Sequence, residues 1–405
     1  MNAVGIDISK GKCMVAVLRP LGEVVKEPFE VEHDYGALES LAYTLKGLEG
    51  ETRAIMESTG RYYEPVAQVL HEIGVFVSVV NPGLIHDFGN NSLRRVKTDK
   101  KDALKIAKFG LDNWAALREY TPMEAVRQQL KNASRQLALY TKIKTGLKNN
   151  LIALLDMTWP GVNTLFNSPV RSDGREKWVD FAYTFWHADC VCLLTEAVFV
   201  EKYRKWCKRK GYNFSQYKAE DLYIESLGHF TTLPKNRSTR TLIHEAITAL
   251  NSISRTAEVF RAEMQRLAEL LPEYSVVMEM YGVGKSIGPQ LMAEIGDVRR
   301  FAHRGALIAY AGVDPQPSQS GKYDRNSNPI SRKGSSSIRK SLYQVMVTLL
   351  RKAPANEPIY QFIDRKRSEG KPYFVYMTAG ANKFLRIYYA RVKEHLSKLD
   401  ESSTT

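Results

Sequence analysis

The order of short apolar segments and helical patterns in the first 112 residues constrains the fold most. Residues 3–7 (AVGID), 13–20 (CMVAVLRP) and 24–31 (VVKEPFEV) predict three strands in quick succession. Helical and strand patterns then alternate: helix 35–48, strand 53–59, helix 62–74, strand 75–82 and helix 98–110. Alternation of this kind predicts an α/β unit whose sheet includes parallel strands.

The first three predicted strands narrow the fold class of this unit. Three meandering strands precede the first crossover, and no GxGxxG or Walker loop follows the first of them. This order is typical of an RNase H-like (RuvC-like) sheet and argues against a doubly wound nucleotide-binding fold. Thr98 is a good N-cap for the helix that follows it. We expect this α/β domain to span residues 1–115.

Two long helical patterns occupy the centre of the chain. Residues 121–158 are basic, with leucines among lysines, and residues 240–271 carry an apolar stripe that begins at Leu242 and Ala246. They predict coiled-coil arms within residues 116–271, which pair either in one chain or between subunits. The inserted segment 159–239 is rich in aromatic and basic residues. Its aromatics fit a core slightly better than a clamp for nucleic acid.

The remainder predicts a mostly helical C-terminal domain over residues 272–396, followed by a disordered tail at 397–405. Residues 282–286 (GVGKS) form a glycine-hinged turn between two helical stretches. This pattern resembles a helix-hairpin-helix element, whose backbone amides can bind a DNA phosphate. The fold class is therefore α/β followed by α.

The charge of the chain indicates a polyanionic partner. Lys and Arg number 58 against 44 acids, which gives a net charge of +14. Such an excess favours nucleic acid through counterion release. The four cysteines lack any zinc spacing, and no window approaches an uninterrupted apolar span of membrane length. We expect a cytoplasmic protein with no membrane partner.

Four carboxylates follow strand ends or open a helix in the α/β unit. Asp7 and Glu57 each end a strand, and Asp99 and Asp102 lie three residues apart in the first turn of a helix. Such acids repel one another unless a hard cation such as Mg²⁺ neutralises them. Taken one at a time, each of these acids could simply be a turn residue or a helix cap. Together they predict a metal site for phosphodiester chemistry. A junction-resolving nuclease stays open, and an exonuclease with Asp-x-Glu is disfavoured by Ser9.

A serine-rich segment at residues 315–343 carries a second candidate site. Ser318 and Ser320 are both eligible nucleophiles once a base or metal activates the hydroxyl. The alternative is a polar loop. The cations that can balance the charge of a phosphate are Lys322, Arg325, Arg332 and Lys333.

These motifs together resemble the insertion-sequence 110 family, the DEDD transposases described as bridge-RNA-guided recombinases. The N-terminal resemblance rests on GIDISK, MESTGRYYEPVAQVLHEIG, VSVVNP and VKTDKKDA. The C-terminal resemblance rests on YGVGKSIGPQLMAEIGD, RRFAHRGALIAYAGVDP, QSG and ISRKGSSSIRKSLY. It covers residues 1–112 and about 272–390, in the order of the family.

The resemblance implies roles for both sites. Asp7, Glu57, Asp99 and Asp102 would bind Mg²⁺, and Ser320, directly before Gly321, would attack DNA and form a covalent phosphoserine link. Donor and target DNA would pair with a bridge RNA, and the protein would act as a homo-oligomer, a dimer or tetramer.

Two departures from the family pattern bear on these roles. Segment 159–239 is longer than the linker of compact members, and serines stand in ISRKGSSSIRKS where Gly-Asn or Gly-Asp is more usual. Ser318 and Ser335 therefore stay lesser alternatives as nucleophile. A hydrolytic nuclease and a non-catalytic nucleic-acid-binding protein remain the competing functions.

Overall fold

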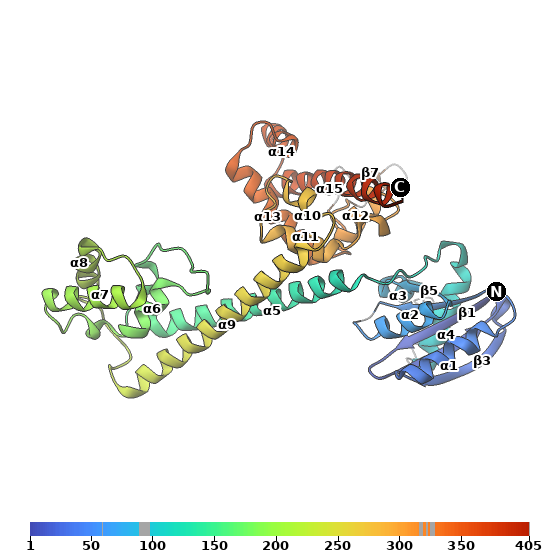
Figure 1. Ribbon diagram of the computed structural model, residues 1–405, viewed down its shortest axis with the longest axis horizontal. Helices are drawn as coiled ribbons and strands as arrows, with labels where there is room; N and C mark the ends of the chain where they lie inside the picture. The colour runs from blue at the N-terminus through green and yellow to red at the C-terminus, as the bar shows by residue number, and fades with distance from the viewer. Residues whose placement is uncertain (59, 89–97, 316–318, 321–322, 325–328, 405) are drawn as a thin grey trace. The chain divides into compact units, whose positions relative to one another are not determined.

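The chain folds into two units, Met1–Pro122 and Met123–Thr405. The computed structural model describes residues 1–58, 60–88, 98–315, 319–320, 323–324 and 329–404 (Figure 1). The first unit ends seven residues beyond the predicted boundary at 115. The extension has a clear cause, because the amide of Tyr120 donates a hydrogen bond to Val77 O at 2.7 Å.

The first unit contains a five-stranded sheet in the order β3-β2-β1-β4-β5. Its strands are β1 (Asn2–Ile8), β2 (Lys12–Leu18), β3 (Val24–Glu32), β4 (Thr52–Glu57) and β5 (Phe76–Val80). The first three pair antiparallel, whereas β4 is parallel to β1 and β5 is parallel to β4. This is the RNase H-like arrangement, and it confirms the fold class expected for this region.

Helices cover the two faces of the sheet. Helices α1 (Tyr35–Lys46) and α2 (Tyr63–Glu72) share a core with Val4 and Ile6 on one face. Helix α4 (Asp99–Asp112) packs on the opposite face against Ala3 and Ile55. Thr98 caps α4 as expected, since its side chain accepts a hydrogen bond from the amide of Lys101 at 3.3 Å. A short helix, α3 (Pro82–Phe88), follows β5 where the sequence predicted only a strand end. Short 3-10 turns η1 (Pro20–Gly22) and η2 (Trp114–Ala116) complete the unit.

Two long helices form the backbone of the second unit. Helices α5 (Ala125–Asp156) and α9 (Arg237–Glu269) lie side by side (Figure 1). Pairing within one chain, one of the two options left open by sequence, is therefore observed. The buried stripe of α9 begins at Ile243 and Ile247, whereas Leu242 is exposed, so the predicted phase of the stripe is wrong at this end.

The inserted segment folds onto one end of this helix pair as a small helical subdomain. Its elements are η3 (Val162–Thr164), α6 (Lys177–Thr184), η4 (Ala188–Cys190), α7 (Glu196–Lys210) and α8 (Gln216–Glu225). Trp159, Phe181, Phe199, Tyr203 and Trp206 are buried in one core with Ile243 and Ile247 of α9. The interpretation of these aromatics as core is confirmed.

The C-terminal part of the second unit is helical around a separate core. Its elements are α10 (Tyr274–Met278), α11 (Ile287–Ile295), η5 (Val298–Arg300), α12 (Arg304–Ala311), α13 (Ser336–Lys352), α14 (Pro358–Ser368) and α15 (Tyr373–Thr404), with two-residue strands β6 (Gln319–Ser320) and β7 (Tyr323–Asp324). Ala257, Met264 and Leu267 of α9 join this core. Across the described parts of the chain, no helix combines the length and apolarity needed to cross a bilayer.

The prediction of a disordered tail at 397–405 is wrong. Helix α15 continues to Thr404, and within residues 397–405 only residue 405 lies outside the described residues. Arg299 of η5 explains the continuation, because its Nη1 donates to Asp400 Oδ2 at 2.8 Å. This pair ties the end of α15 to the body of the C-terminal core.

Candidate active site

Strand register brings two of the four predicted acids together. Ile6 of β1 lies opposite Met56 of β4 in the parallel pair, so Asp7 and Glu57 are the next neighbours along the two strands. Side chains alternate between faces along a strand. Because Ile6 and Met56 belong to the core under α1 and α2, Asp7 and Glu57 project to the other face.

Helix α4 brings the other two acids to the same face. A Cβ added to Gly5 would collide with the backbone of Ala103 and Ala107, so α4 lies directly on β1 at this point. A Cβ at Gly110, near the end of α4, would instead meet Ile55 and Ala3. The helix therefore runs antiparallel to β1, and its first turn, with Asp99 and Asp102, lies toward the end of β1 that carries Asp7.

Gly5 is a position that sequence reasoning missed, and it sets how closely α4 packs on β1. A β carbon would push α4 away from the sheet and with it the two acids of its first turn. The available signal was a glycine inside an otherwise apolar strand, which often marks close approach of another backbone.

The surroundings of the acidic edge are charged and partly exposed. Lys12 of β2 donates to Glu30 Oε2 at 2.6 Å, and this hydrogen bond is the main reason that the pKa of Lys12 is raised, with a smaller contribution from Asp99. Burial, with smaller contributions from Asp7 and two glutamates, raises the pKa of Cys13 to about 12. Cys13 is therefore a neutral thiol at neutral pH, and only a thiolate binds metal well.

The donor set at this edge consists of carboxylates, which are the ligands that Mg²⁺ prefers. Within the described residues, no three His, Cys, Asp or Glu side chains lie close enough to hold a metal ion. The four acids thus share one edge of the sheet without forming a finished ligand shell. Their chemistry fits a divalent cation, with Asp7 and Glu57 supplied by strands and Asp99 and Asp102 by a helix start.

The serine segment lies between α12 and α13. Ser320 ends strand β6 and lies opposite Tyr323 of β7 in an antiparallel pair. The structure places the backbone of Ser320 but does not describe its side chain. Ser318, Lys322 and Arg325 lie outside the described residues.

The base of this segment is held by hydrogen bonds from side chains. Ser331 Oγ donates to Asp314 Oδ1 at 2.6 Å, and Arg339 Nη1 donates to the carbonyls of Ala311 at 2.9 Å and Gly334 at 3.0 Å. Arg339 thus joins the two ends of the segment. Sequence reasoning did not single it out, because its partners are carbonyl groups that any residue could supply.

Ser335 has a structural task in this arrangement. Its Oγ accepts a hydrogen bond from the amide of Ile338 at 3.3 Å and so caps α13. Its hydroxyl also donates to Glu294 Oε2 at 3.3 Å. A serine occupied on both sides is a poor nucleophile, which favours Ser320 over Ser335.

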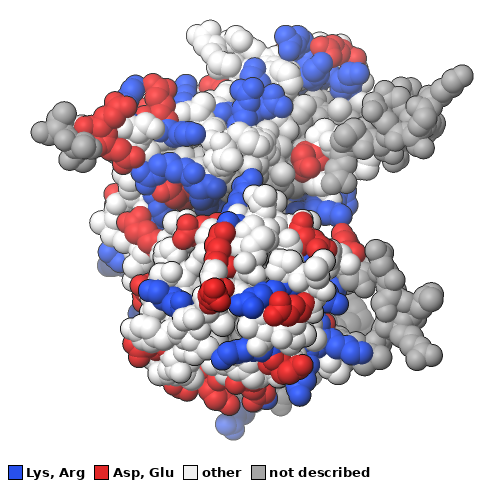
Figure 2. All heavy atoms as spheres, turned by 90° about the vertical axis from the view of Figure 1, so that its right-hand side faces the viewer, with Lys and Arg blue, Asp and Glu red and all other residues white. Residues whose placement is uncertain are grey.

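Basic charge is distributed unevenly over the chain. Figure 2 shows one face on which Lys and Arg are interspersed with Asp and Glu. From Ala125 to Leu155, in contrast, α5 carries six Lys and Arg and no acid. Arg127 is buried against Glu273 and Lys148 pairs with Glu176. The cations of α5 that can attract a polyanion are therefore Lys131, Arg135, Lys142 and Lys144.

An RNase H-like sheet that carries carboxylates at the C-terminal ends of its neighbouring strands β1 and β4 defines a class of fold. Metal-dependent nucleases and recombinases are built on this class of fold. Sequence comparison then gives the family. Residues 4–160 match the family model of the DEDD transposases of IS110, and residues 274–361 match the transposase family IS116/IS110/IS902. Together these stretches cover more than half of the chain, which belongs to the IS110 family of transposases.

Individual relatives agree with this assignment. The pilin gene-inverting protein of Moraxella bovis is 22% identical over 346 residues, which are 84% of this chain and 80% of the relative. An uncharacterised 42 kDa protein of insertion element IS900 from Mycobacterium paratuberculosis is 29% identical over 30% of this chain and 29% of its own length. Among solved structures, Thermus thermophilus RuvC in complex with a Holliday junction substrate covers 29% of this chain and 96% of RuvC, at 14% identity and a TM-score of 0.23.

Proposed function

We propose that this transposase cuts and rejoins donor and target DNA through a covalent serine–DNA intermediate, with Mg²⁺ bound by Asp7, Glu57, Asp99 and Asp102. The observation that supports this most is the convergence of four acids, from β1, β4 and α4, on one face of the sheet. Carboxylates that lie on one face repel one another, and a bound cation offsets this repulsion.

In this proposal the two units supply different parts of the reaction: one carries the nucleophilic serine and the other carries the metal ligands. The Oγ of Ser320 attacks a phosphorus atom of DNA and forms an Oγ–P bond, its proton passes to a base, and the displaced sugar oxygen leaves and takes up a proton. A divalent cation at the acidic edge supplies charge stabilisation for the attacking and leaving oxygens. Rejoining reverses the step when a sugar hydroxyl attacks the phosphoserine.

This division requires the two units to meet on DNA. Asp7 belongs to the unit 1–122 and Ser320 to the unit 123–405. We propose that a homo-oligomer, a dimer or tetramer, supplies both, either from one chain or from two. Arg339 is a positioning residue in this scheme, since it holds both ends of the segment that carries Ser320.

We further propose that a bridge RNA guides the choice of DNA, with base pairing reading the sequence and the protein reading backbone shape. Lys131, Arg135, Lys142 and Lys144 of α5, together with the net charge of +14, support a long polyanion as the partner. The name of one relative, a pilin gene-inverting protein, supports DNA rearrangement as the outcome.

We place the reaction in the cytoplasm, where the four free cysteines stay reduced.

A covalent-trapping assay tests the proposal. The protein, Mg²⁺, its RNA and labelled DNA are mixed, denatured and separated on a gel. We expect a protein–DNA adduct that disappears in Ser320→Ala and persists in Ser337→Ala, a change at an exposed serine of α13. We expect Asp7→Asn to abolish the adduct and Asp112→Asn, at the far end of α4, to retain it.

The alternatives give different results in the same assay. Cleaved DNA without an adduct would mean a hydrolytic nuclease, such as a junction resolvase, with Ser320 a loop residue. Binding without cleavage in wild type and in every variant would mean a non-catalytic nucleic-acid-binding protein.

A further inference from the structure

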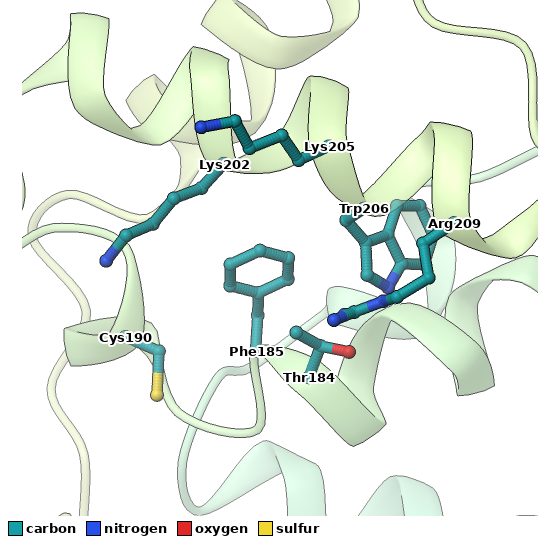
Figure 3. A pocket seen from close by; sticks show the side chains of 7 residues that line it. All are labelled: Thr184, Phe185, Cys190, Lys202, Lys205, Trp206 and Arg209. Atoms are coloured by element: carbon teal, nitrogen blue, oxygen red, sulfur yellow. The ribbon is translucent and has the colours of Figure 1, made fainter.

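The inserted subdomain contains a cationic hollow that the proposed chemistry does not use. The hollow has a volume of about 460 Å³ and lies between α6, η4 and α7. It is lined by Thr184, Phe185, Cys190, Lys202, Lys205, Trp206 and Arg209 (Figure 3). Three of these seven residues are cationic and none is acidic.

The cations come from one face of a single helix. Lys202, Lys205 and Arg209 follow at intervals of three and four along α7, so they lie on the same side of it. Lys205 has a partner in Glu201, with Nζ 3.7 Å from Oε1. Within the described part of the chain, Lys202 and Arg209 form no ion pair. Two exposed charges therefore remain available for an anion.

The aromatic wall of the hollow has its ring faces already in use. Trp206 stacks on Tyr203 with ring centroids 5.5 Å apart and on Tyr212 at 5.3 Å. Phe185 packs on Phe181 at 4.8 Å and edge-on against Phe199 at 5.5 Å. Neither ring offers a free face to a nucleobase, so the hollow does not fit a stacked base.

Polar groups at the wall match the oxygens of a phosphate instead. The indole Nε1 of Trp206 is buried and has no hydrogen-bond partner among the described residues. Thr184 adds a hydroxyl at the end of α6. Figure 3 shows the Trp206 nitrogen on the edge of the ring nearest the Arg209 side chain. Donors with nearby cations are what a phosphodiester recruits.

We infer that this hollow on α7 binds the sugar–phosphate backbone of a nucleic acid held by the transposase. This deepens the proposed function and rests on it, since the hollow would add a second cationic anchor to that of helix α5. RNA and DNA share this chemistry, and the experiment separates them.

The test compares two charge reversals on the same helix. Lys202→Glu with Arg209→Glu changes the face that lines the hollow, and Arg204→Glu with Lys208→Glu makes the same change in charge at two positions of α7 that do not line it. Fluorescence anisotropy is measured for the full-length protein with an RNA hairpin and with duplex DNA, in EDTA and over a range of salt.

We expect the first pair to weaken binding of one or both probes about tenfold or more and to lower the salt slope by about one to two. The control pair should change affinity by less than about threefold. Trp206→Phe should weaken binding a few-fold without changing the salt slope, because it removes an N–H and no charge. Loss with RNA alone assigns the hollow to RNA, and loss with DNA alone assigns it to DNA.

Two results would overturn the inference. Equal losses for both charge reversals would mean general attraction to the subdomain, and unchanged binding for the first pair would mean that no nucleic acid reaches the hollow. Melting temperatures of all variants identify a loss of fold. Binding is measured in EDTA, so a failure of the proposed catalysis would leave this test intact.

Discussion

At the scale of single residues, Gly5 shows how a missing methyl group positions a site. Its Cα faces the backbone of Ala103 and Ala107, and no side chain fits between them. The close approach places the first turn of α4, with Asp99 and Asp102, on the face that carries Asp7.

We predict that Gly5→Ala destabilises the first unit by about 3 kcal/mol, the upper end for overpacking, because a clash with backbone cannot be relieved by a rotamer change. Urea unfolding followed by circular dichroism measures this. Gly36→Ala is the matched control, since a Cβ there would meet only Asp34 Oδ1 at 3.5 Å within a helix start. An unchanged urea midpoint for Gly5→Ala would contradict the packing described here.

Glu176 offers a prediction with a defined pH dependence. Burial alone would raise the pKa of its carboxyl, but hydrogen bonds from Lys148 at 2.6 Å and Trp178 at 2.8 Å outweigh burial and lower the pKa. A carboxyl whose pKa is lower in the folded state stabilises the fold above its unfolded pKa, about 4.3, and loses this effect as pH falls through the folded value.

We therefore expect Glu176→Gln to lower the stability of the inserted subdomain at pH 7 by about 1–3 kcal/mol. The difference from wild type should shrink as the pH falls below about 4. Thermal melts between pH 3 and pH 7 measure it, with Glu220→Gln on α8 as the control, since Glu220 accepts an exposed hydrogen bond from Gln216. A difference that stays constant across this range would rule out the charged hydrogen bonds as its source.

The residues of the candidate site were accessible from sequence to different degrees. Asp7, Glu57, Asp99 and Asp102 stand at strand ends and a helix start, so element order alone predicted a shared edge. Arg339 was not accessible, because it binds the carbonyl of Ala311 28 residues away. Such pairs depend on the folded path of the chain and leave no local pattern.

At the scale of elements, most strands and helices follow from periodicity, and the exceptions have local causes. Proline at position 82 was interpreted as the end of β5, but proline also suits the first turn of a helix, and α3 begins there. Leu242 and Ile243 are adjacent, so the stripe of α9 had two possible phases. The aromatic core of the inserted subdomain selects Ile243 and Ile247.

The end of α15 is the clearest case of tertiary contact overriding a local pattern. Serine and threonine are weak helix formers, and a polar chain end usually frays. Here Arg299 binds both Asp297, with Nη2 to Oδ2 at 2.7 Å, and Asp400 on the helix. The helix is therefore anchored one turn before its end.

We expect Arg299→Ala to release this anchor. Amides of residues 398–404 should exchange with deuterium about tenfold faster, while those around Tyr388 should be unchanged because that part of α15 is buried. Hydrogen exchange with mass spectrometry measures both. Lys398→Ala removes only an exposed pair with Glu394 at 2.7 Å and should have little effect. Equal exchange in wild type and Arg299→Ala would show that α15 holds its end without η5.

At the scale of the whole molecule, separate hydrophobic cores organise the chain. The first unit has its own cores on the two faces of its sheet, and the α5–α9 pair has one core at each end. From composition and patterns, the sequence predicted domains over residues 1–115, 116–271 and 272–396. It could not place the boundary after the first unit, because Leu117 and Tyr120 belong to no helix or strand yet pack on the sheet.

The boundary gives a prediction about independent folding. The amide of Tyr120 bonds to Val77 of the edge strand β5, and its ring meets His71 edge-on at 6.0 Å. We expect residues 1–122 to unfold cooperatively in urea as an isolated domain, and residues 1–115 to be less stable by about 2–3 kcal/mol. That value combines one hydrogen bond with two partly buried side chains. Tyr120→Ala in the longer fragment should account for about half of the difference, because Leu117 remains. Equal stability of the two fragments would instead mean that 116–122 is a linker, and the boundary would then move back to 115.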